Sequence, residues 1–129
     1  MQKPSSELTR AEWTIIKMVW QKEPCTAPDI QEALHMQTGW TYSTVRTLMD
    51  RMAGKGVLVA EKTRNLTFYR SAVTKGQAQR TELLSAVKKA FNGAFTPMVQ
   101  CLLETGELSS DELAEIESLI KAKRKAAKK

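Results

Sequence analysis

The hydrophobic positions in the first half of the chain recur with the period of an α-helix, about 3.6 residues, in three successive segments. The first segment, residues 9–22, opens with Thr9 and Glu12 at the spacing of a capping box. Its apolar stripe consists of Ala11, Ile15, Met18 and Val19. We therefore predict a first helix that packs this stripe into a core.

A second helix is predicted to run from the N-cap Thr26 to about residue 37. Thr26 and Asp29 repeat the capping-box spacing, and Pro28 suits the first helical turn because its missing N–H would be unpaired there in any case. Gly39 is expected to end the helix. The residues expected to be buried are Ile30, Ala33 and Leu34.

The third helix is predicted to begin after the N-cap Thr41 and to stop near Gly54. Val45, Leu48 and Met52 give it a core-facing side. The other side is rich in hydroxyl and guanidinium groups, whereas a face built only for stability more often carries Glu, Lys, Gln and Ala. The polar residues in question are Tyr42, Ser43, Thr44, Arg46, Thr47 and Arg51.

After the third helix the hydrophobic period changes to two. Residues 57–63 and 66–71 are rich in β-branched and aromatic residues. The Arg64-Asn65 pair between them fits a short hairpin, because Asn tolerates a positive φ. Three helices followed by a hairpin predict a winged helix-turn-helix domain over residues 1–73.

The rest of the chain, residues 74–129, is predicted to form three short amphipathic helices. They cover residues 74–91, residues 97–104, and a last segment that starts at the capping box of Ser109 and Glu112. Such short helices cannot bury their apolar faces alone, so a partner surface is implied, most simply that of a second copy. The fold class is therefore mostly α with a small β-hairpin, and the expected dimer interface comprises Leu84, Val87, Phe91, Phe95, Met98, Val99, Leu102, Leu103, Leu113, Ile116, Leu119 and Ile120.

The charge of the chain is +6 over 129 residues, and it is segregated. Residues 41–70 hold six Lys/Arg against two acids, residues 104–117 hold six acids and no base, and residues 121–129 hold six bases and no acid. The excess of basic residues over residues 41–70, which cover the predicted third helix and hairpin, favours a polyanionic partner. The basic C-terminal tail has two interpretations, complementing the dipole of the last helix or attracting DNA nonspecifically.

Composition argues against an enzyme, a metalloprotein and a membrane protein. The chain has one histidine, two distant cysteines (Cys25 and Cys101) and no phosphate-binding glycine loop, so we expect no active site, metal or cofactor. Both cysteines have apolar neighbours and are expected to act as small hydrophobes. No apolar run approaches the roughly 18 residues that span a bilayer, and "MQKPSSELTR" lacks a signal-peptide core, so the expected location is the cytoplasm.

The polar face of the third helix has the chemistry needed to read duplex DNA. Ser and Thr hydroxyls bond phosphates or base edges, and Arg reads guanine bidentately. Lys62 and Arg64 are expected at the wing tip, and Lys55 and the helix start at Thr26 are expected to anchor phosphates. Two alternatives stay open: a winged helix that contacts only proteins, and a ligand- or thiol-sensing winged-helix regulator.

The segments "LTRAEWTIIKMVW", "TVRTLMDRMAGKGVL" and "FYRS", in this order, resemble the penicillinase-repressor family. That family represses β-lactamase and methicillin-resistance genes, and copper-responsive repressors are its relatives. The resemblance runs from Leu8 through "LSSDELAEIESLI". It implies a homodimeric winged-helix repressor that binds a palindromic operator and dimerises through its C-terminal helices. By position it assigns DNA reading to the helix of residues 41–54, where some relatives carry Lys in place of Ser43.

Two departures from the family concern regulation. In antibiotic-responsive members a sensor-dependent protease cuts an Asn-Phe bond in the helix that matches residues 98–104, where this chain has Cys101-Leu102. Copper-responsive members end in closely spaced cysteines, whereas this chain ends in "KAKRKAAKK". A regulatory protease is thus a possible partner that the resemblance alone does not assign, and the inducer is left open.

Overall fold

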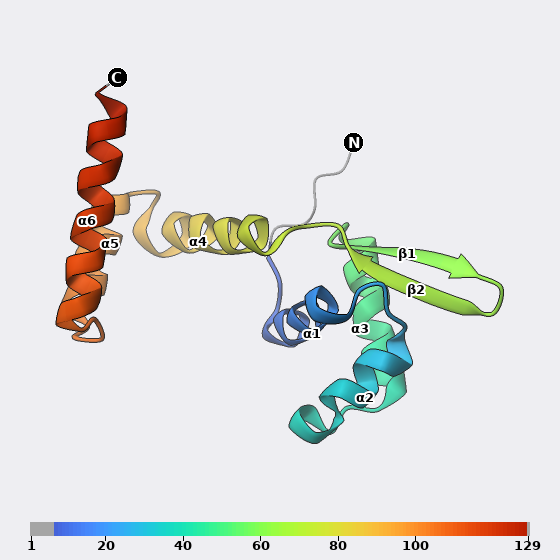
Figure 1. Cartoon of the computed structure of the whole chain (residues 1–129). Coiled ribbons are helices and arrows are strands. Elements are labelled where there is room, and N and C mark those ends of the chain that lie inside the picture. Colours follow the sequence, from blue (N-terminus) through green and yellow to red (C-terminus); the bar gives the residue numbers. More distant parts are fainter. Residues whose placement is uncertain (1–6, 129) are drawn as a thin grey trace. The chain divides into compact units, whose positions relative to one another are not determined.

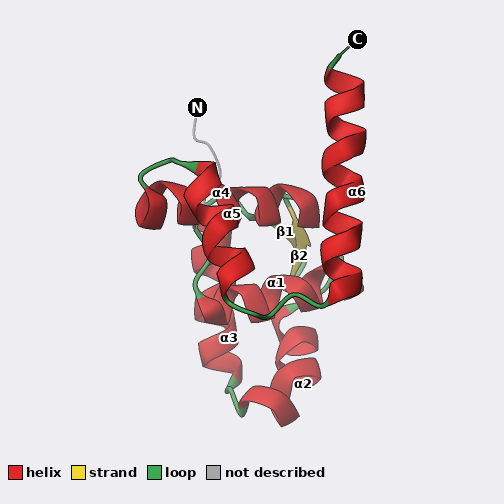
Figure 2. Ribbon diagram, turned by 90° about the vertical axis from the view of Figure 1, so that its left-hand side faces the viewer, coloured by secondary structure: helices red, strands yellow, loops and turns green. Residues whose placement is uncertain are grey.

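The computed structural model describes residues 7–128, and over this range the chain forms six helices and one two-stranded hairpin (Figures 1 and 2). The N-terminal part of the segment considered as a signal peptide, and Lys129 of the basic tail, lie outside the described residues. The elements are α1 (Arg10–Lys22), α2 (Ala27–Thr38), α3 (Tyr42–Gly54), β1 (Leu58–Thr63), β2 (Leu66–Ser71), α4 (Lys75–Phe91), α5 (Phe95–Glu104) and α6 (Ser110–Ala127). The predicted fold class is confirmed.

The helix starts are the ones that the sequence predicts. Thr9, Thr26 and Ser109 each accept a hydrogen bond from the N–H three residues on, in complete capping boxes at the starts of α1, α2 and α6. Thr41 caps α3 in the same way through the N–H of Thr44, at 3.2 Å. Gly39 follows α2 with φ of 69°, a left-handed conformation that glycine adopts without strain, and turns the chain into α3.

The core of the first compact unit, Met1–Ser85, lies between α1, α2, α3 and the hairpin. Several residues pack differently from the prediction: Ala11, Ala33 and Leu48 are only half-buried, while Ile16 and Met49 are fully buried. Each helix therefore presents a slightly rotated stripe to the core. The fully buried side chains of α3 are Val45, Met49 and Met52.

The hairpin is antiparallel, with Leu58 paired with Ser71 and Thr63 paired with Leu66. Its two-residue turn is where the sequence predicts it, but the positive φ of 58° belongs to Arg64 rather than to Asn65. The first turn position takes the left-handed conformation, so the expected use of Asn65 is wrong in detail. Beside α2, Cys25 and Tyr69 exchange backbone hydrogen bonds of 3.0 and 2.7 Å, which fix β2 to the start of that helix.

The second compact unit, Ala86–Lys129, contains the end of α4 together with α5 and α6. The division between the two units falls inside α4. Asn92 and Gly93 end α4 with positive φ values of 52° and 83°. Within its described residues Val87 is buried, and neither α5 nor α6 has a buried residue. These two helices leave their apolar faces uncovered.

None of the helices over residues 7–128 is both long enough and apolar enough to cross a membrane.

Candidate nucleic-acid interface

The outer face of α3 carries the residues singled out from the sequence. Tyr42, Ser43, Thr44, Thr47 and Arg51 are exposed, and Arg46 is half-buried. Since the opposite face is held by fully buried side chains, the helix presents this surface rigidly. The result is a row of hydroxyl and guanidinium groups along about two and a half helical turns.

Arg46 lies at the centre of a hydrogen-bonded chain that the sequence did not predict. Its Nε donates to both carboxylate oxygens of Asp50 at 3.1 and 3.3 Å, and its Nη1 donates to the hydroxyl oxygen of Tyr42 at 3.1 Å. Tyr69 of β2 in turn donates its hydroxyl to Asp50 at 2.7 Å. The hydrogen bond with Tyr42, followed by the charges around it, raises the pKa of Arg46 above its ordinary value. These hydrogen bonds hold the Arg46 guanidinium in place and connect α3 to the hairpin.

Asp50 and Tyr69 therefore support this surface, and the sequence pattern did not single them out. Asp50 contacts Arg46 directly, and Tyr69 contacts Asp50. Asp50 is four residues after Arg46, a spacing at which helical side chains meet, so its ion pair was open to prediction. The Tyr69 bond spans 19 positions and depends on how the hairpin packs against α3.

Burial, followed by the hydrogen bond to Asp50, raises the pKa of Tyr69 to about 12 from an ordinary value of 10.0. Because the folded state holds the neutral phenol, its contribution to stability is complete below pH 10 and is lost as the pH rises through about 12. As the pH rises from 10 to about 12, we expect the free energy of unfolding of the wild type to fall by up to about 2–3 kcal/mol more than that of Tyr69→Phe. Urea titrations across this range measure the difference.

The exposed Tyr42→Phe is the matched control, and it should keep the wild-type steepness because Tyr69 is untouched. Equal pH dependence in the wild type and Tyr69→Phe would contradict the assignment.

A cavity of about 80 Å³ lies where the start of α2, the start of α3 and the wing turn meet. It brings together Thr26, Tyr42 and Arg46, which the sequence proposed separately, and adds Thr67 of β2. The Thr26 hydroxyl oxygen accepts from the N–H of Asp29 at 3.2 Å, so its own proton can still be donated. Hydroxyl and guanidinium donors thus line one small cavity.

Lys62 and Arg64 are exposed at the end of β1 and in the wing turn. Between the strands, Arg70 forms an exposed ion pair with Glu61 at 3.6 Å.

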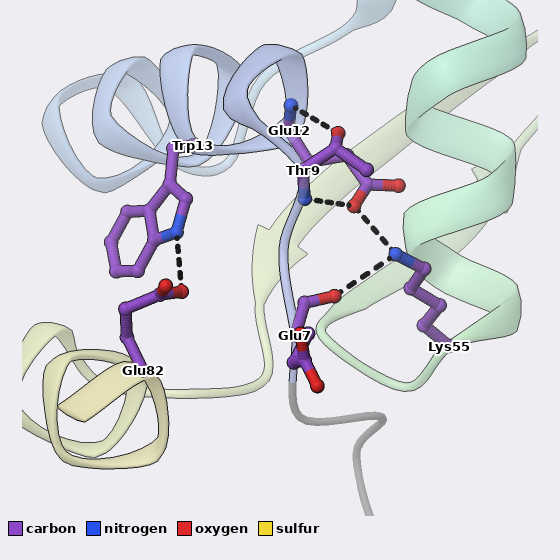
Figure 3. Close-up of polar contacts among 6 residues, drawn as sticks. All are labelled: Glu7, Thr9, Glu12, Trp13, Lys55 and Glu82. Carbon is purple, nitrogen blue, oxygen red and sulfur yellow. Dashed lines mark hydrogen bonds and ion pairs between the residues drawn. The ribbon is translucent and has the colours of Figure 1, made fainter. Parts of the chain in front are cut away.

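Lys55 is placed differently from the other cations, because its ammonium is directed into the protein (Figure 3). Its Nζ lies 2.6 Å from Oε1 of Glu12, a fully buried carboxylate, and donates to the backbone oxygen of Glu7 at 3.2 Å. Burial raises the pKa of Glu12, but hydrogen bonds from Lys55 and from the Thr9 N–H outweigh it, so the net pKa is lowered. Lys55 is occupied by an internal ion pair in this structure.

The two cysteines differ. Cys25 is buried, and burial followed by the nearby charges of Asp29 and Glu23 raises the pKa of its thiol to about 11. Such a thiol is protonated and unreactive at neutral pH. Cys101 is exposed, so the expectation that it packs as a small hydrophobe does not hold for it in the described chain, where α5 has no buried residue.

A family model described as penicillinase repressor matches residues 8–122 of the chain. Among curated relatives, the methicillin resistance regulatory protein MecI of Staphylococcus aureus (strain N315) is 28% identical over 95% of this chain and 100% of its own length. The penicillinase repressor of Staphylococcus aureus is 23% identical over 88% of this chain and 90% of its own length.

Two solved structures have a similar fold. The solution structure of the DNA-binding domain of the repressor BlaI gives a TM-score of 0.53 at 21% identity, covering 60% of this chain and 93% of that one. The solution structure of monomeric Bacillus licheniformis BlaI in complex with the blaP half-operator gives a TM-score of 0.50 at 21% identity and the same coverage. At this identity the similarity concerns the fold.

Proposed function

Since this chain belongs to the penicillinase-repressor family, a family of DNA-binding transcriptional repressors rather than enzymes, we propose that it binds a palindromic operator as a homodimer. The observation that carries the proposal is the outer face of α3, where hydroxyls and guanidiniums are exposed beside a basic wing. This surface can donate to phosphates and base edges at once.

We assign different roles to the residues of this surface. Ser43, Thr44, Thr47 and Arg51 are the proposed base readers, because they are exposed and Arg51 has no ionic partner among those found within residues 7–128. Lys62 and Arg64 of the wing would contact phosphates or the adjacent minor groove. We propose a structural role for Lys55, whose ammonium is bound by Glu12.

A backbone phosphate is the proposed occupant of the cavity between α2, α3 and the wing turn. Thr26, Tyr42 and Thr67 supply hydroxyls there, and Arg46 supplies charge. A charge-assisted bond from a fixed guanidinium is stronger than one from a mobile side chain, because less rotational freedom is lost on binding. Arg46 would then position the register of α3 on the duplex, with Asp50 holding it.

The second unit supplies the proposed dimer interface. Its uncovered apolar faces include Phe95, Leu102 and Leu103 on α5, which are 56%, 42% and 49% exposed. Apolar area of this kind is rarely left in water by a stable unit. Two copies joined there would present two α3 helices to successive major grooves about 34–36 Å apart. An occupied operator that overlaps a promoter would exclude RNA polymerase.

Relief of repression by a protease is a separate hypothesis. The Cys101–Leu102 peptide bond lies inside α5, and the helix must unwind there before a protease can bind the segment in extended form.

Thiol sensing at Cys25 is disfavoured, because the raised pKa of this thiol keeps it protonated at neutral pH.

Arg51→Ala is expected to weaken operator binding by about 1–3 kcal/mol and to relax the preference at one base position, as for a base-reading arginine. Arg46→Ala is expected to weaken binding to all sequences and to reduce the slope of log affinity against log salt by about one unit. Fluorescence anisotropy titrations at several salt concentrations measure both.

Arg70→Ala, which removes an arginine near the end of β2 and away from the wing turn, is the control for loss of charge alone. An Arg51→Ala protein with unchanged affinity at low and high salt would remove Arg51 from the proposed contacts.

Selection of sites from random duplex DNA tests the function as a whole. The proposal predicts enrichment of an inverted repeat by the purified wild-type protein. Binding that never distinguishes one sequence from another would contradict it.

A further inference from the structure

The end of α6 carries basic side chains on one face of the helix. α6 is one continuous helix of 18 residues, and Lys128 follows it as the C-cap (Figures 1 and 2). Four cations recur at i, i+3, i+4 and i+7, so at 100° per residue they lie on the same side: Lys121, Arg124, Lys125 and Lys128. All four are exposed, and together they line a surface hollow of about 380 Å³. We call these four residues the basic face of α6.

The positive charge of the basic face is not neutralised within residues 7–128. The ion pairs found there involve other cations, namely Arg46, Lys55 and Arg70. Glu117 lies one turn before Lys121, but the two form no ion pair, and no acidic residue follows Glu117 in the sequence. The basic face therefore presents its charge to solvent.

The helix dipole accounts for only part of this arrangement. It favours cations in the last turn, where Arg124 and Lys125 lie, and its effect falls off before Lys121. Like charges four residues apart destabilise a helix. Lys121 and Lys125 are one such pair. Arg124 and Lys128 are another. An anionic partner would replace this repulsion with attraction.

The chemistry of the basic face suits phosphates and not base edges. The small residues of this segment are alanines, so residues 121–128 offer no hydroxyl or amide of the kind that the outer face of α3 carries. A lysine ammonium on a flexible stem acts as a point charge, which binds a phosphate without reading a base. Seven residues of helix extend about 10.5 Å, a length over which one strand of duplex DNA presents about three phosphates. The basic face thus matches a short stretch of one DNA backbone.

We infer that the basic face of α6 is a second contact for duplex DNA, which binds backbone phosphates without regard to sequence. The inference rests on the proposed function in taking duplex DNA as the polyanion. It goes beyond that function by assigning a phosphate-binding surface to the second compact unit, in addition to the base-reading surface of α3. Such a contact holds the protein on any duplex and raises its affinity for DNA that lacks an operator.

The test uses the full-length variant K121Q/R124Q/K125Q/K128Q and a duplex of random sequence. Glutamine forms helices about as well as lysine, so circular dichroism and sedimentation of the variant should match those of the wild type. In anisotropy titrations at several salt concentrations, the slope of log affinity against log salt should fall by about two to three units. At about 50 mM salt, the affinity should fall about tenfold or more.

A pair of single variants tests whether the contact involves one face. Lys125→Gln removes a charge from the basic face and should lower the salt slope by about one unit. Lys123→Gln is its matched control, because it makes the same change two residues earlier, on the opposite side of the helix. Its salt slope should stay close to that of the wild type.

Four results would overturn the inference. A fourfold variant with the wild-type salt slope on random duplex rejects the basic face, and it leaves the proposed function intact if Arg46→Ala still weakens operator binding. A wild-type chain that binds no duplex rejects both. Equal loss of slope in Lys123→Gln and Lys125→Gln rejects a one-faced contact. If the fourfold variant binds DNA like the wild type but no longer binds phosphatidylserine vesicles that the wild type binds, the face belongs to a lipid surface instead.

Discussion

Replacing Lys55 with methionine lowers the free energy of unfolding by about 2–4 kcal/mol, because it leaves the Glu12 carboxylate buried without its cation. Glu12 is 0% exposed, and its Oε2 has no hydrogen-bond partner within the described residues, so its Oε1 carries all of the compensation. The lower end of the range applies because the Lys55 side chain is 23% exposed, so water already screens part of its attraction to Glu12. Urea unfolding at neutral pH measures the loss.

The pH dependence of this loss identifies its cause. The pKa of Glu12 is lowered in the folded wild type, so the stability it contributes is present above the ordinary value of 4.5 and is lost as the pH falls below it. The gap between wild type and Lys55→Met should therefore narrow in acid. Glu12→Gln combined with Lys55→Met should recover most of the loss, since no buried charge then remains. An equally unstable double variant would contradict this account.

Leu102→Asp should divide the dimer into single chains and weaken operator binding by about 100-fold or more. A charge would enter the apolar face of α5 in both copies. The resulting monomer would bind through one α3 surface and lose the higher affinity that two linked surfaces give. Light scattering gives the oligomeric state, and anisotropy titration of the operator gives the affinity.

Cys101→Asp is the control, because it introduces the same charge at an exposed position of the same helix, outside the hollow lined by Phe95, Val99 and Leu103. It should leave the dimer and operator binding near wild-type values. If Leu102→Asp remains dimeric, the interface lies elsewhere than on the apolar face of α5.

The elements of this fold are predictable because their signals are local. Caps such as Thr9 and Ser109 lie within three residues of the groups that they satisfy, and the hairpin changes the hydrophobic period at once. The exposed face of α3 follows from the same periodicity. Local pattern thus fixes what kind of surface each helix presents.

Contacts between distant positions were not predictable from the same patterns. Lys55 looks like a surface cation in a Gly-Lys-Gly sequence, yet its partner Glu12 lies 43 positions earlier. The pattern around Tyr69 predicts only a strand residue, and its hydrogen bond to Asp50 forms because the hairpin packs against α3. Both are pairings of polar groups made by tertiary packing, which carries no periodic signal along the chain.

A dimeric repressor places two α3 surfaces, one from each chain, on one duplex. Footprinting of the wild-type protein on a selected site, with the number of bound chains counted, tests this most directly. We expect two chains per duplex and two protected major-groove patches whose centres are one helical turn apart, about 10–10.5 base pairs, or a whole multiple of it. One bound chain protecting a single patch at saturation would contradict it.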